Sequence, residues 1–572
     1  MKIVSGKSTA SYIALSYVWG QPTIGQLQLS KTNFEHLTQS GALLEHWDRI
    51  PKVIQQTIKL VREFTILGES RYLWVDSLCI IQNDPNHKIG QISAMGIVYG
   101  QALMTVAAVG ADSAQQQLLR YEDGHNHEQL LEDLDCIRRH LGVQVGIDHG
   151  PFVFHQKSSP RVESREYFRR GWIFQEQYLS RRIMACPRAD SPFLYYCRES
   201  AIPETPNDLQ LHDFGSEFQG LETARRSILE YQRLVNDYTS KDFGHHDDSL
   251  RAFAGVLESL KHSSRKQSSI KHCVCGVPCE EIGLGLFWID EEKESVRALR
   301  APLISTREYH ERHWVENIPA QSQLRFPSWS WASREVDEQI RYPLYGGWKS
   351  RQSSENSKDQ YRWDNENVSC RLRSVAVIEK SKNSQTSVAD FPSSSDVEWK
   401  SEEFWSQIGI DSFCLLRIEA RNMQWPNGIR IEESKCPVTL PYGTRPLAWA
   451  EKERGYRNRR HWLSPWTEEE RYAYLFCQSL GSESDGNQSL EPGLLLAGRG
   501  SNYEGVKQLL EVSDMQSLRV VFLCYDVEGD LTTLIVRPRR AYYQRVGVAV
   551  FPKSSEVARQ LRETPPSSLV LC

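Results

Sequence analysis

Strand-like and helix-like segments alternate through the first 200 residues, and this alternation constrains the fold more than any other feature of the chain. Strand-like apolar runs lie at residues 12–20, 71–81, 103–111, 181–186 and 193–197, and helix-like segments lie at residues 49–64, 89–102 and 167–180. In the first helical segment, apolar residues recur at helical spacing and Pro51 stands in the first turn. Such alternation predicts an α/β domain, a parallel sheet with helices on both faces.

The rest of the chain divides by its pattern into further regions. A chain of 572 residues is too long for one core. We predict an α/β domain over residues 1–200 with an insertion at about 111–160, a helical region over 201–324, and a β-rich C-terminal region over 325–572 with Ser-rich loops. The insertion contains a charged, helix-like piece at residues 127–141. The helical middle rests on segments such as "ARRSILEYQRLVNDY", and the C-terminal region on short apolar runs such as "RVVFLCYDV".

Composition and charge exclude several classes of protein. The formal net charge is -5, from 68 basic and 73 acidic residues, which argues against a dedicated nucleic-acid-binding protein. No secretory signal and no apolar run long enough for a membrane span is seen. Thirteen scattered cysteines favour reduced thiols. We therefore expect a cytoplasmic protein that contacts neither membrane nor nucleic acid.

Two short stretches have residue types found in metal or nucleic-acid sites. "HCVCGVPC", residues 272–279, gathers cysteines and a histidine, but its Cys-x-Cys spacing is unusual for a closed zinc site, so no metal is expected. "ERGYRNRRHW", residues 453–462, mixes basic and aromatic residues beside an acidic run, which favours a solvated loop. "FPSWSWAS", residues 326–333, is interpreted as an aromatic packing motif.

Three motifs together resemble a known family. "ALSYVWG", "LWVDSLCIIQND" and "RRGWIFQEQYLSRRI" occur in the order found in the heterokaryon-incompatibility (HET) domain of filamentous fungi. Two positions depart from the usual motifs: Ile81 stands in place of an Asn, and Ile173 in place of a Thr. Segments near "YTSKDFGHHDDSLRAFAGVL" and "RFPSWSWAS" also resemble stretches that commonly follow this domain.

The resemblance implies a role in fungal non-self recognition, an innate-immunity function in which such domains trigger growth arrest or programmed cell death. HET domains are similar to TIR domains, which have a flavodoxin-like parallel sheet, and some TIR domains cleave NAD with a Glu four residues after a Trp. Trp172 and Glu176 have that spacing. The resemblance therefore implies Glu176 as the catalytic residue of an NAD+ glycohydrolase, with NAD+ as substrate and no resident cofactor. It also implies a homo-oligomer or another incompatibility protein as partner.

The chemistry of NAD+ cleavage is compatible with one carboxylate. Positions i and i+4 share a helix face, so Trp172 and Glu176 are neighbours. Breaking the ribose–nicotinamide bond builds oxocarbenium character, and nicotinamide leaves as a neutral group, so no acid is needed to protonate it. The carboxylate would accept the ribose hydroxyls and stabilise the developing positive charge. In the alternative interpretation, Glu176 pairs with Arg170 or Arg182 and only supports the fold.

The ends of two predicted strands supply the candidate substrate-binding residues. Ligands bind beyond the carboxyl ends of strands in open α/β sheets. This rule selects Ser16, Tyr17, Trp19, Gly20 and Asp76, to which Trp172 is added from the third motif. The aromatic rings would stack on a base, Ser16 and Asp76 would hydrogen-bond ribose or phosphate-linked groups, and Gly20 would allow a turn. Alternatively, Tyr17 and Trp19 are core aromatics and Asp76 caps the next helix.

Two hypotheses of different classes follow. In the first, a HET-domain effector of growth arrest or cell death hydrolyses NAD+ with Glu176. In the second, the domain is a non-catalytic signalling module that self-associates or docks on a homologous domain, and the motifs only build its core.

Overall fold

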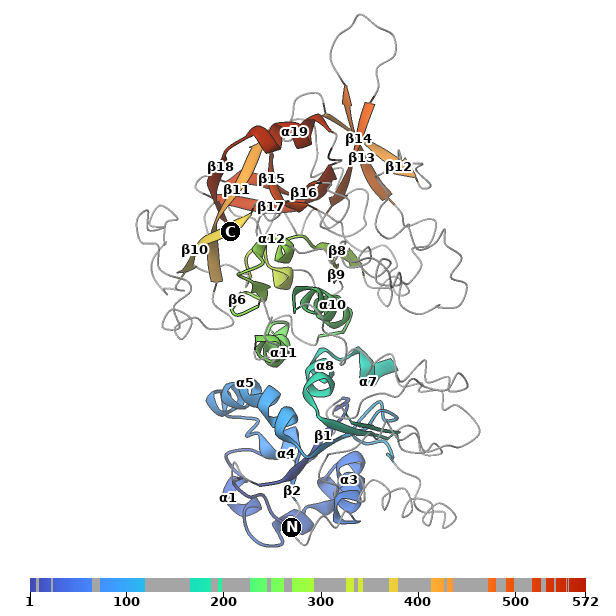
Figure 1. The fold of residues 1–572 in the computed structure, drawn as a ribbon. Helices are drawn as coiled ribbons and strands as arrows, with labels where there is room; N and C mark the ends of the chain where they lie inside the picture. Colours follow the sequence, from blue (N-terminus) through green and yellow to red (C-terminus); the bar gives the residue numbers. More distant parts are fainter. Residues whose placement is uncertain are drawn as a thin grey trace, which may run out of the picture. The chain divides into compact units, whose positions relative to one another are not determined.

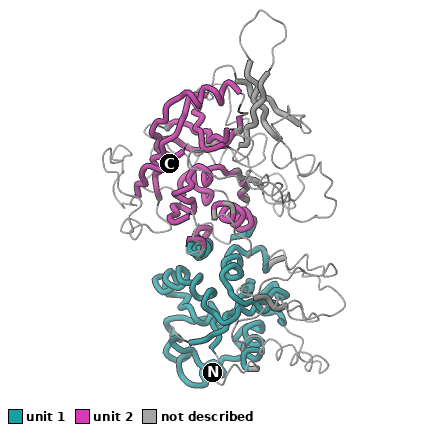
Figure 2. The backbone as a smooth tube through the Cα atoms, in the orientation of Figure 1, with its two compact units in different colours: residues 1–224, 241–243, 251–259 teal, residues 225–240, 244–250, 260–572 magenta. Residues whose placement is uncertain are grey.

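The computed structural model describes twenty segments of the chain, which form two compact units. The described residues are 1–6, 10–21, 24–63, 72–118, 165–186, 194–197, 227–243, 248–261, 270–292, 326–333, 338–342, 370–378, 413–425, 429–435, 472–479, 490–497, 517–525, 531–539, 542–551 with 553, and 555–572. Unit 1 comprises Met1–Ala224, Lys241–Phe243 and Arg251–Ser259, and unit 2 comprises Arg225–Ser240, Gly244–Leu250 and Leu260–Cys572 (Figure 2). The domain boundaries expected at 200 and 324 stay predictions.

A five-stranded sheet forms the centre of unit 1 (Figure 1). Its strands are β1 (Tyr12–Ser16), β2 (Tyr72–Trp74), β3 (Met104–Ala107), β4 (Arg182–Ala185) and β5 (Leu194–Cys197), in the order β2-β1-β3-β4-β5. The first four are parallel, and β5 runs antiparallel to β4. The order 2-1-3-4 is that of flavodoxin-like doubly wound sheets. The prediction of an α/β N-terminal domain is confirmed.

Helices cover both faces of this sheet because side chains alternate along β1. Ile13, Leu15 and Tyr17 join the core that includes Val53 and Ile54 of α3. On the opposite face, Ala14 packs with Met95 and Tyr99 of α5, and Val18 packs with Tyr167 and Ile173. The helices of unit 1 are α1 (Phe34–Leu37), α2 (Ala42–Glu45), α3 (Lys52–Glu63), α4 (Asp76–Cys79), α5 (Pro85–Gln101), α7 (Arg165–Arg169), α8 (Gly171–Leu179) and most of α11 (Arg251–Lys261), with 3-10 turn η1 (Trp47–Arg49).

The apolar run at 71–81 is only partly a strand, which corrects the sequence interpretation. β2 ends at Trp74, and the helical turn α4 begins at Asp76, with the Cys79 amide bonding the Val75 carbonyl oxygen at 2.7 Å. The Asp76 carboxylate accepts a bond from the Ser77 amide at 2.6 Å. This local bond favours a turn over a strand, because short polar side chains compete with sheet hydrogen bonding.

The helix expected at 167–180 is interrupted at Arg170, which separates α7 from α8. Arg170 pairs with Asp242 in an isolated parallel bridge, and the Gly171 amide donates to the Asp242 carbonyl oxygen at 2.9 Å. We call residues 241–243 the clamp. A Cβ on Gly171 would lie 2.0 Å from Cε1 of Phe243, so only glycine fits there without a shift of the ring.

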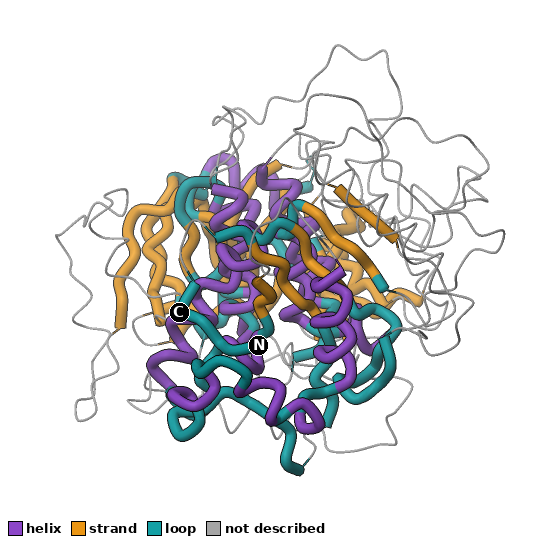
Figure 3. The backbone as a smooth tube through the Cα atoms, turned by 90° about the horizontal axis from the view of Figure 1, so that it is seen from below, coloured by secondary structure: helices purple, strands orange, loops and turns teal. Residues whose placement is uncertain are grey.

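Unit 2 contains a nine-stranded sheet, which confirms the β-rich C-terminal region. Its strands are β10 (Arg371–Ile378), β11 (Phe413–Gln424), β12 (Ile429–Lys435), β13 (Tyr472–Ser479), β14 (Leu490–Ala497), β15 (Arg519–Tyr525), β16 (Leu531–Arg539), β17 (Tyr542–Phe551) and β18 (Pro566–Leu571). They follow the order β10-β11-β15-β16-β17-β14-β13-β12, with β18 beside β11 and β17. The pairs are antiparallel except for the short contact of β17 with β18. Figure 3 distinguishes strands from helices by colour.

Helices and short hairpins complete unit 2. They are α10 (Ser227–Thr239), the end of α11 (Arg251–Lys261), α12 (Ile282–Gly285), the hairpin of β6 (Cys273–Val274) with β7 (Val277–Pro278), the hairpin of β8 (Ile289–Glu292) with β9 (Glu338–Arg341), and 3-10 turn η3 (Trp331–Ser333). The aromatic packing motif is confirmed: Phe326, Trp329 and Trp331 are buried, and the Trp331 indole donates to the Tyr231 hydroxyl at 2.9 Å.

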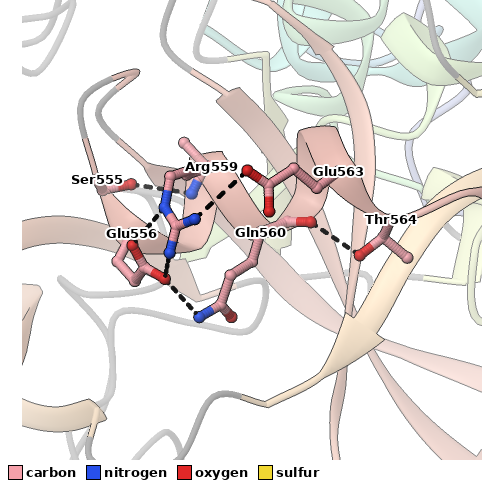
Figure 4. Close-up of polar contacts among 7 residues, drawn as sticks. Ser555, Glu556, Arg559, Gln560, Glu563 and Thr564 are labelled. Atoms are coloured by element: carbon pink, nitrogen blue, oxygen red, sulfur yellow. Dashed lines mark hydrogen bonds and ion pairs between the residues drawn. The ribbon is translucent and has the colours of Figure 1, made fainter.

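A short helix near the C-terminus, α19 (Glu556–Glu563), was not predicted from the sequence. Ser555 caps it by accepting a bond from the Ala558 amide at 3.2 Å. Arg559 bonds Glu556 and Glu563 on the exposed face (Figure 4), while Val557, Ala558 and Leu561 are buried in the core of unit 2. The helix is therefore amphipathic, with its stability drawn from the buried face.

Several expectations concern residues outside the described segments: the insertion from 119 onward with its piece at 127–141, the Ser-rich tract at 381–396, and the basic stretch at 453–462. Within the described segments, no group of three or more His, Cys, Asp or Glu is placed to hold a metal ion. None of the helices described combines the length and apolar character that crossing a bilayer requires.

Candidate functional site

Two buried hydroxyls meet where β1 ends. Ser16, the last residue of β1, lies 2.6 Å from the Tyr167 hydroxyl of α7, and both residues are buried. β1 lies between β2 and β3, and the chain crosses to opposite sides of it, so its carboxyl end is the switch point where ligands bind in such sheets. Ser16 therefore stands at the position that the fold favours for a site.

Asp76 links the loop after β1 to the first turn of α4. Its Oδ2 accepts a hydrogen bond from the Trp19 indole at 2.7 Å, and its Oδ1 accepts the Ser77 amide at 2.6 Å. The Ser77 hydroxyl lies 2.9 Å from the Tyr17 hydroxyl, which donates to it. Burial raises the pKa of Asp76, and the bonds from Trp19 and Ser77 act against that rise. Three of the predicted residues, Tyr17, Trp19 and Asp76, thus form one connected polar group together with Ser77.

Glu176 lies in α8 and is 7% exposed. Burial raises the pKa of its carboxyl to about 7, with the charge of Asp76 acting in the same direction. The Ser16 hydroxyl, the Arg170 charge and the Tyr99 hydroxyl lower it. Its Oε2 atom is buried and has no hydrogen-bond partner among the described residues. A buried, unsatisfied carboxylate oxygen is costly in a structure that only has to fold.

Trp172 and Gly20 contact other neighbours. Trp172 is half-buried and packs on the cluster of Ala14, Met95 and Tyr99. It lies on the same face of α8 as Glu176, four residues along the helix. Gly20 has a φ of +70°, and a Cβ there would lie 2.6 Å from the Cβ of Ser113. Glycine is therefore required at position 20, because of the positive φ and because the loop containing Ser113 approaches the backbone closely.

Arg170 was considered in the sequence only as an ion-pair partner of Glu176. Its Nη1 instead donates to the Tyr17 carbonyl oxygen at 2.9 Å, and it makes no salt bridge within the described segments. Its neighbour Arg169 pairs with Asp242 at 2.6 Å. The guanidinium lies near enough to lower the pKa of Asp76, Glu176 and Tyr167. Arg170 is a cation placed beside two carboxyl groups without neutralising either one.

Sequence reasoning missed two tyrosines of the site. Tyr167 bonds Ser16, and the Tyr99 hydroxyl donates to the Leu15 carbonyl oxygen at 3.1 Å. Burial raises the pKa of both, so both hydroxyls stay protonated. In the Ser16–Tyr167 pair either hydroxyl can be the donor. Tyr167 lies two residues before the third motif, which was a usable signal, whereas Tyr99 lies in a helix whose pattern does not distinguish it from a core residue.

The comparison with protein families gives one finding. Residues 12–176 match the family described as heterokaryon incompatibility protein (HET). These residues form a HET domain. The predicted site residues all lie within it, and Glu176 is its last matched residue. No curated protein and no solved structure matches the chain. The match includes β1, β2 and β3 of the sheet of unit 1 and ends before β4.

Proposed function

We propose that this HET-domain protein acts in fungal non-self recognition and triggers growth arrest or programmed cell death by hydrolysing NAD+. The observation that carries the proposal is the buried Glu176 carboxyl, which interacts with Ser16 at the end of β1 and whose Oε2 has no hydrogen-bond partner within the described segments. The strand order 2-1-3-4 also supports a fold similar to TIR domains, some of which cleave NAD. We place the activity in the cytoplasm.

In the proposed reaction, water replaces nicotinamide at the ribose C1 carbon. The products are nicotinamide, ADP-ribose and one proton. The bonding electrons leave with nicotinamide, which becomes neutral, and the ribose carries oxocarbenium character in the transition state. The ionised Glu176 stabilises that positive charge and accepts hydrogen bonds from the ribose hydroxyls. Ser16 and Tyr167 orient the carboxylate, and Asp76 is held in place by Trp19.

Nicotinamide release by the purified full-length protein tests the proposal. Glu176→Gln keeps the size of the side chain but removes its charge, so the rate is expected to fall roughly 100- to 1000-fold, as when a preorganised electrostatic group is lost. Glu35→Gln, an exposed carboxylate of α1, serves as the matched control and should keep the wild-type rate. The proposal fails if wild type releases no nicotinamide at high protein concentration, or if Glu176→Gln is fully active.

Asp76→Asn gives a second test on the neighbouring carboxylate. If Asp76 lines the substrate site, NAD loss and growth arrest should disappear while the melting temperature changes by only a few degrees. Loss of a purely structural bond would cost about 1 kcal/mol and lower melting without selectively removing activity.

A non-catalytic signalling module is the second candidate, favoured by the outer face of α5. Ile89 and Ile97 are 51% and 61% exposed, and they lie on one helix face with Ser93 between them. No charged residue occurs from Gly90 to Gln101. An uncharged apolar face is suited to a second copy of the domain or to another incompatibility protein, since nothing repels a like surface. Self-association without nicotinamide release would favour this candidate.

A further inference from the structure

The two neighbouring arginines before α8 have different environments. Arg169 pairs with the Asp242 carboxylate through its Nε atom at 2.6 Å. Arg170 has one hydrogen bond among the described residues, from Nη1 to the Tyr17 carbonyl oxygen at 2.9 Å. A guanidinium has five N–H donors in a fixed plane. Most donors of Arg170 are therefore available, and the residue is only half-buried, so a ligand can approach it.

The position of Arg170 is fixed from both sides of the chain. The clamp bridges its backbone through Asp242, and Gly171, the next residue, fits against Phe243. Its side chain is held by the loop that follows β1, through the Tyr17 carbonyl oxygen. A cation held in this way is preorganised, so little side-chain entropy is lost when it binds an anion.

The nearby carboxyl groups leave the charge of Arg170 unpaired. Both oxygens of Asp76 already accept bonds, from Trp19 and from the Ser77 amide. The Oε2 atom of Glu176 has no hydrogen-bond partner among the residues that the structure describes, so the guanidinium does not bond it. An arginine with free donors next to a site is suited to an anion brought by the ligand. Guanidinium groups bind phosphate through two parallel hydrogen bonds.

We infer that Arg170 binds a phosphate group of the substrate, so that the substrate is a nucleotide and not a nucleoside that lacks phosphate. This inference rests on the proposed function for the assignment of Glu176 to the ribose. Arg170 would then hold the phosphate of the reacting half, and Glu176 the ribose next to it. Arg170 contributes to substrate selection, while the carboxylate contributes to bond cleavage.

The first arm of the test measures binding of ADP-ribose, without any reaction, by titration calorimetry of the full-length protein. Arg170→Gln is expected to weaken binding about 10- to 100-fold, the size of a lost charge-assisted hydrogen bond. Arg170→Lys keeps the charge but loses the planar pair of donors, so it should give an intermediate loss. Arg181→Gln, an exposed arginine just after α8, is the matched control and should bind like wild type.

The second arm compares two substrates with the same glycosidic bond, NAD+ and nicotinamide riboside, which has no phosphate. Arg170→Gln should lower the ratio of the two kcat/KM values, NAD+ over nicotinamide riboside, by about 10- to 100-fold. If wild type binds ADP-ribose through Arg170 but releases no nicotinamide, the inference stands and the hydrolysis proposal fails.

Three results would overturn the inference: wild type that does not bind ADP-ribose, an Arg170→Gln variant that binds it as tightly as wild type, or an unchanged substrate ratio. A fold defect is recognised because it would weaken both substrates equally and lower the melting temperature. In that case the ADP-ribose affinity of Arg170→Lys is the deciding measurement, because lysine keeps a donor for the Tyr17 carbonyl oxygen.

Discussion

At the residue scale, Glu176 makes the stability of the protein depend on pH. Its folded pKa of about 7 lies above the unfolded value of about 4.3, so the folded state holds the proton more tightly. The stability contributed by the protonated form is fully present below pH 4.3 and is lost as the pH rises through 7.

Glu176→Gln should remove this loss. Denaturation at pH 5 and pH 8 should show the variant gaining up to about 3 kcal/mol relative to wild type at the higher pH, the free energy of a shift of this size. The same titration should make nicotinamide release rise as the pH passes 7, because the ionised form is the active one. If the free energy of unfolding had the same pH dependence in wild type and variant, the raised pKa of the buried Glu176 carboxyl would be contradicted.

Gly171→Ala is expected to destabilise unit 1 by about 1 to 3 kcal/mol, because the new Cβ would lie 2.0 Å from a ring carbon of Phe243. Gly90→Ala is the matched control in α5, where nothing lies within 4 Å of the added carbon. It should be neutral or stabilising by up to about 1 kcal/mol, since alanine favours a helix. Thermal melting distinguishes the two. Equal melting temperatures would argue against the clamp.

Single residues of the site were predictable only where a motif or strand end marked them. Ser16 and Asp76 follow from the rule on strand ends, and Glu176 follows from its spacing to Trp172. Arg170's bond to Tyr17 and Gly171's fit against Phe243 join distant parts of the chain, so no local pattern reveals them.

At the element scale, α5 and α11 approach closely at two glycines. The Cα of Gly96 would lie 3.0 Å from a Cβ on Gly255, and the same Cβ would meet Gln175 Oε1 and Leu179 Cδ1 of α8, both at 2.8 Å. The Gly255 amide also donates to Gln175 Oε1 at 2.8 Å. These three helices therefore pack on the side of the sheet that holds Glu176.

Gly96→Ala and Gly255→Ala should each lower the free energy of unfolding by about 1 to 3 kcal/mol, because overpacking forces the helices apart. The melting temperature should fall accordingly. The double variant should cost less than the two losses added, since either methyl opens the same gap. Gly100→Ala, whose nearest neighbour lies 3.8 Å away, should behave like wild type. Additive losses would place the two glycines in separate contacts.

Elements with a clear period were predicted best. The helix at 52–63, the strands β1, β3, β4 and β5, and β15 of the C-terminal sheet agree with local patterns. The run at 71–81 misled because its apolar residues continue past β2 into a turn. The break at Arg170 was hidden within a helical pattern, since it depends on Asp242.

At the scale of the whole molecule, the sequence divided the chain into consecutive regions, while the compact units interleave. Unit 1 includes Lys241–Phe243 and Arg251–Ser259, although the residues on either side of these segments belong to unit 2. Hydrophobic periods describe each segment but not which core it joins, so interleaving of this kind is not readable from the pattern.

Limited proteolysis should cut first in the Ser-rich tract at 381–396, because a mostly polar sequence of this kind offers little apolar surface for a protecting core. The run from β2 through α4 should resist, since Val75, Ser77 and Leu78 are buried. Mass spectrometry of the first fragments checks this expectation. Early cleavage within 72–79 would contradict it.

The bridge between Arg170 and Asp242 also bears on protein synthesis. When the ribosome has just added Glu176, the chain already contains both carboxyl groups of the site, Asp76 and Glu176. The clamp, residues 241–243, has not yet been synthesised. At about 5 to 20 residues per second, several seconds of translation separate the two. If the site hydrolyses NAD+, a nascent or prematurely terminated chain has the reacting groups but not the clamp that holds Arg170. The cell that makes the protein is then not exposed to its activity until translation has passed residue 243.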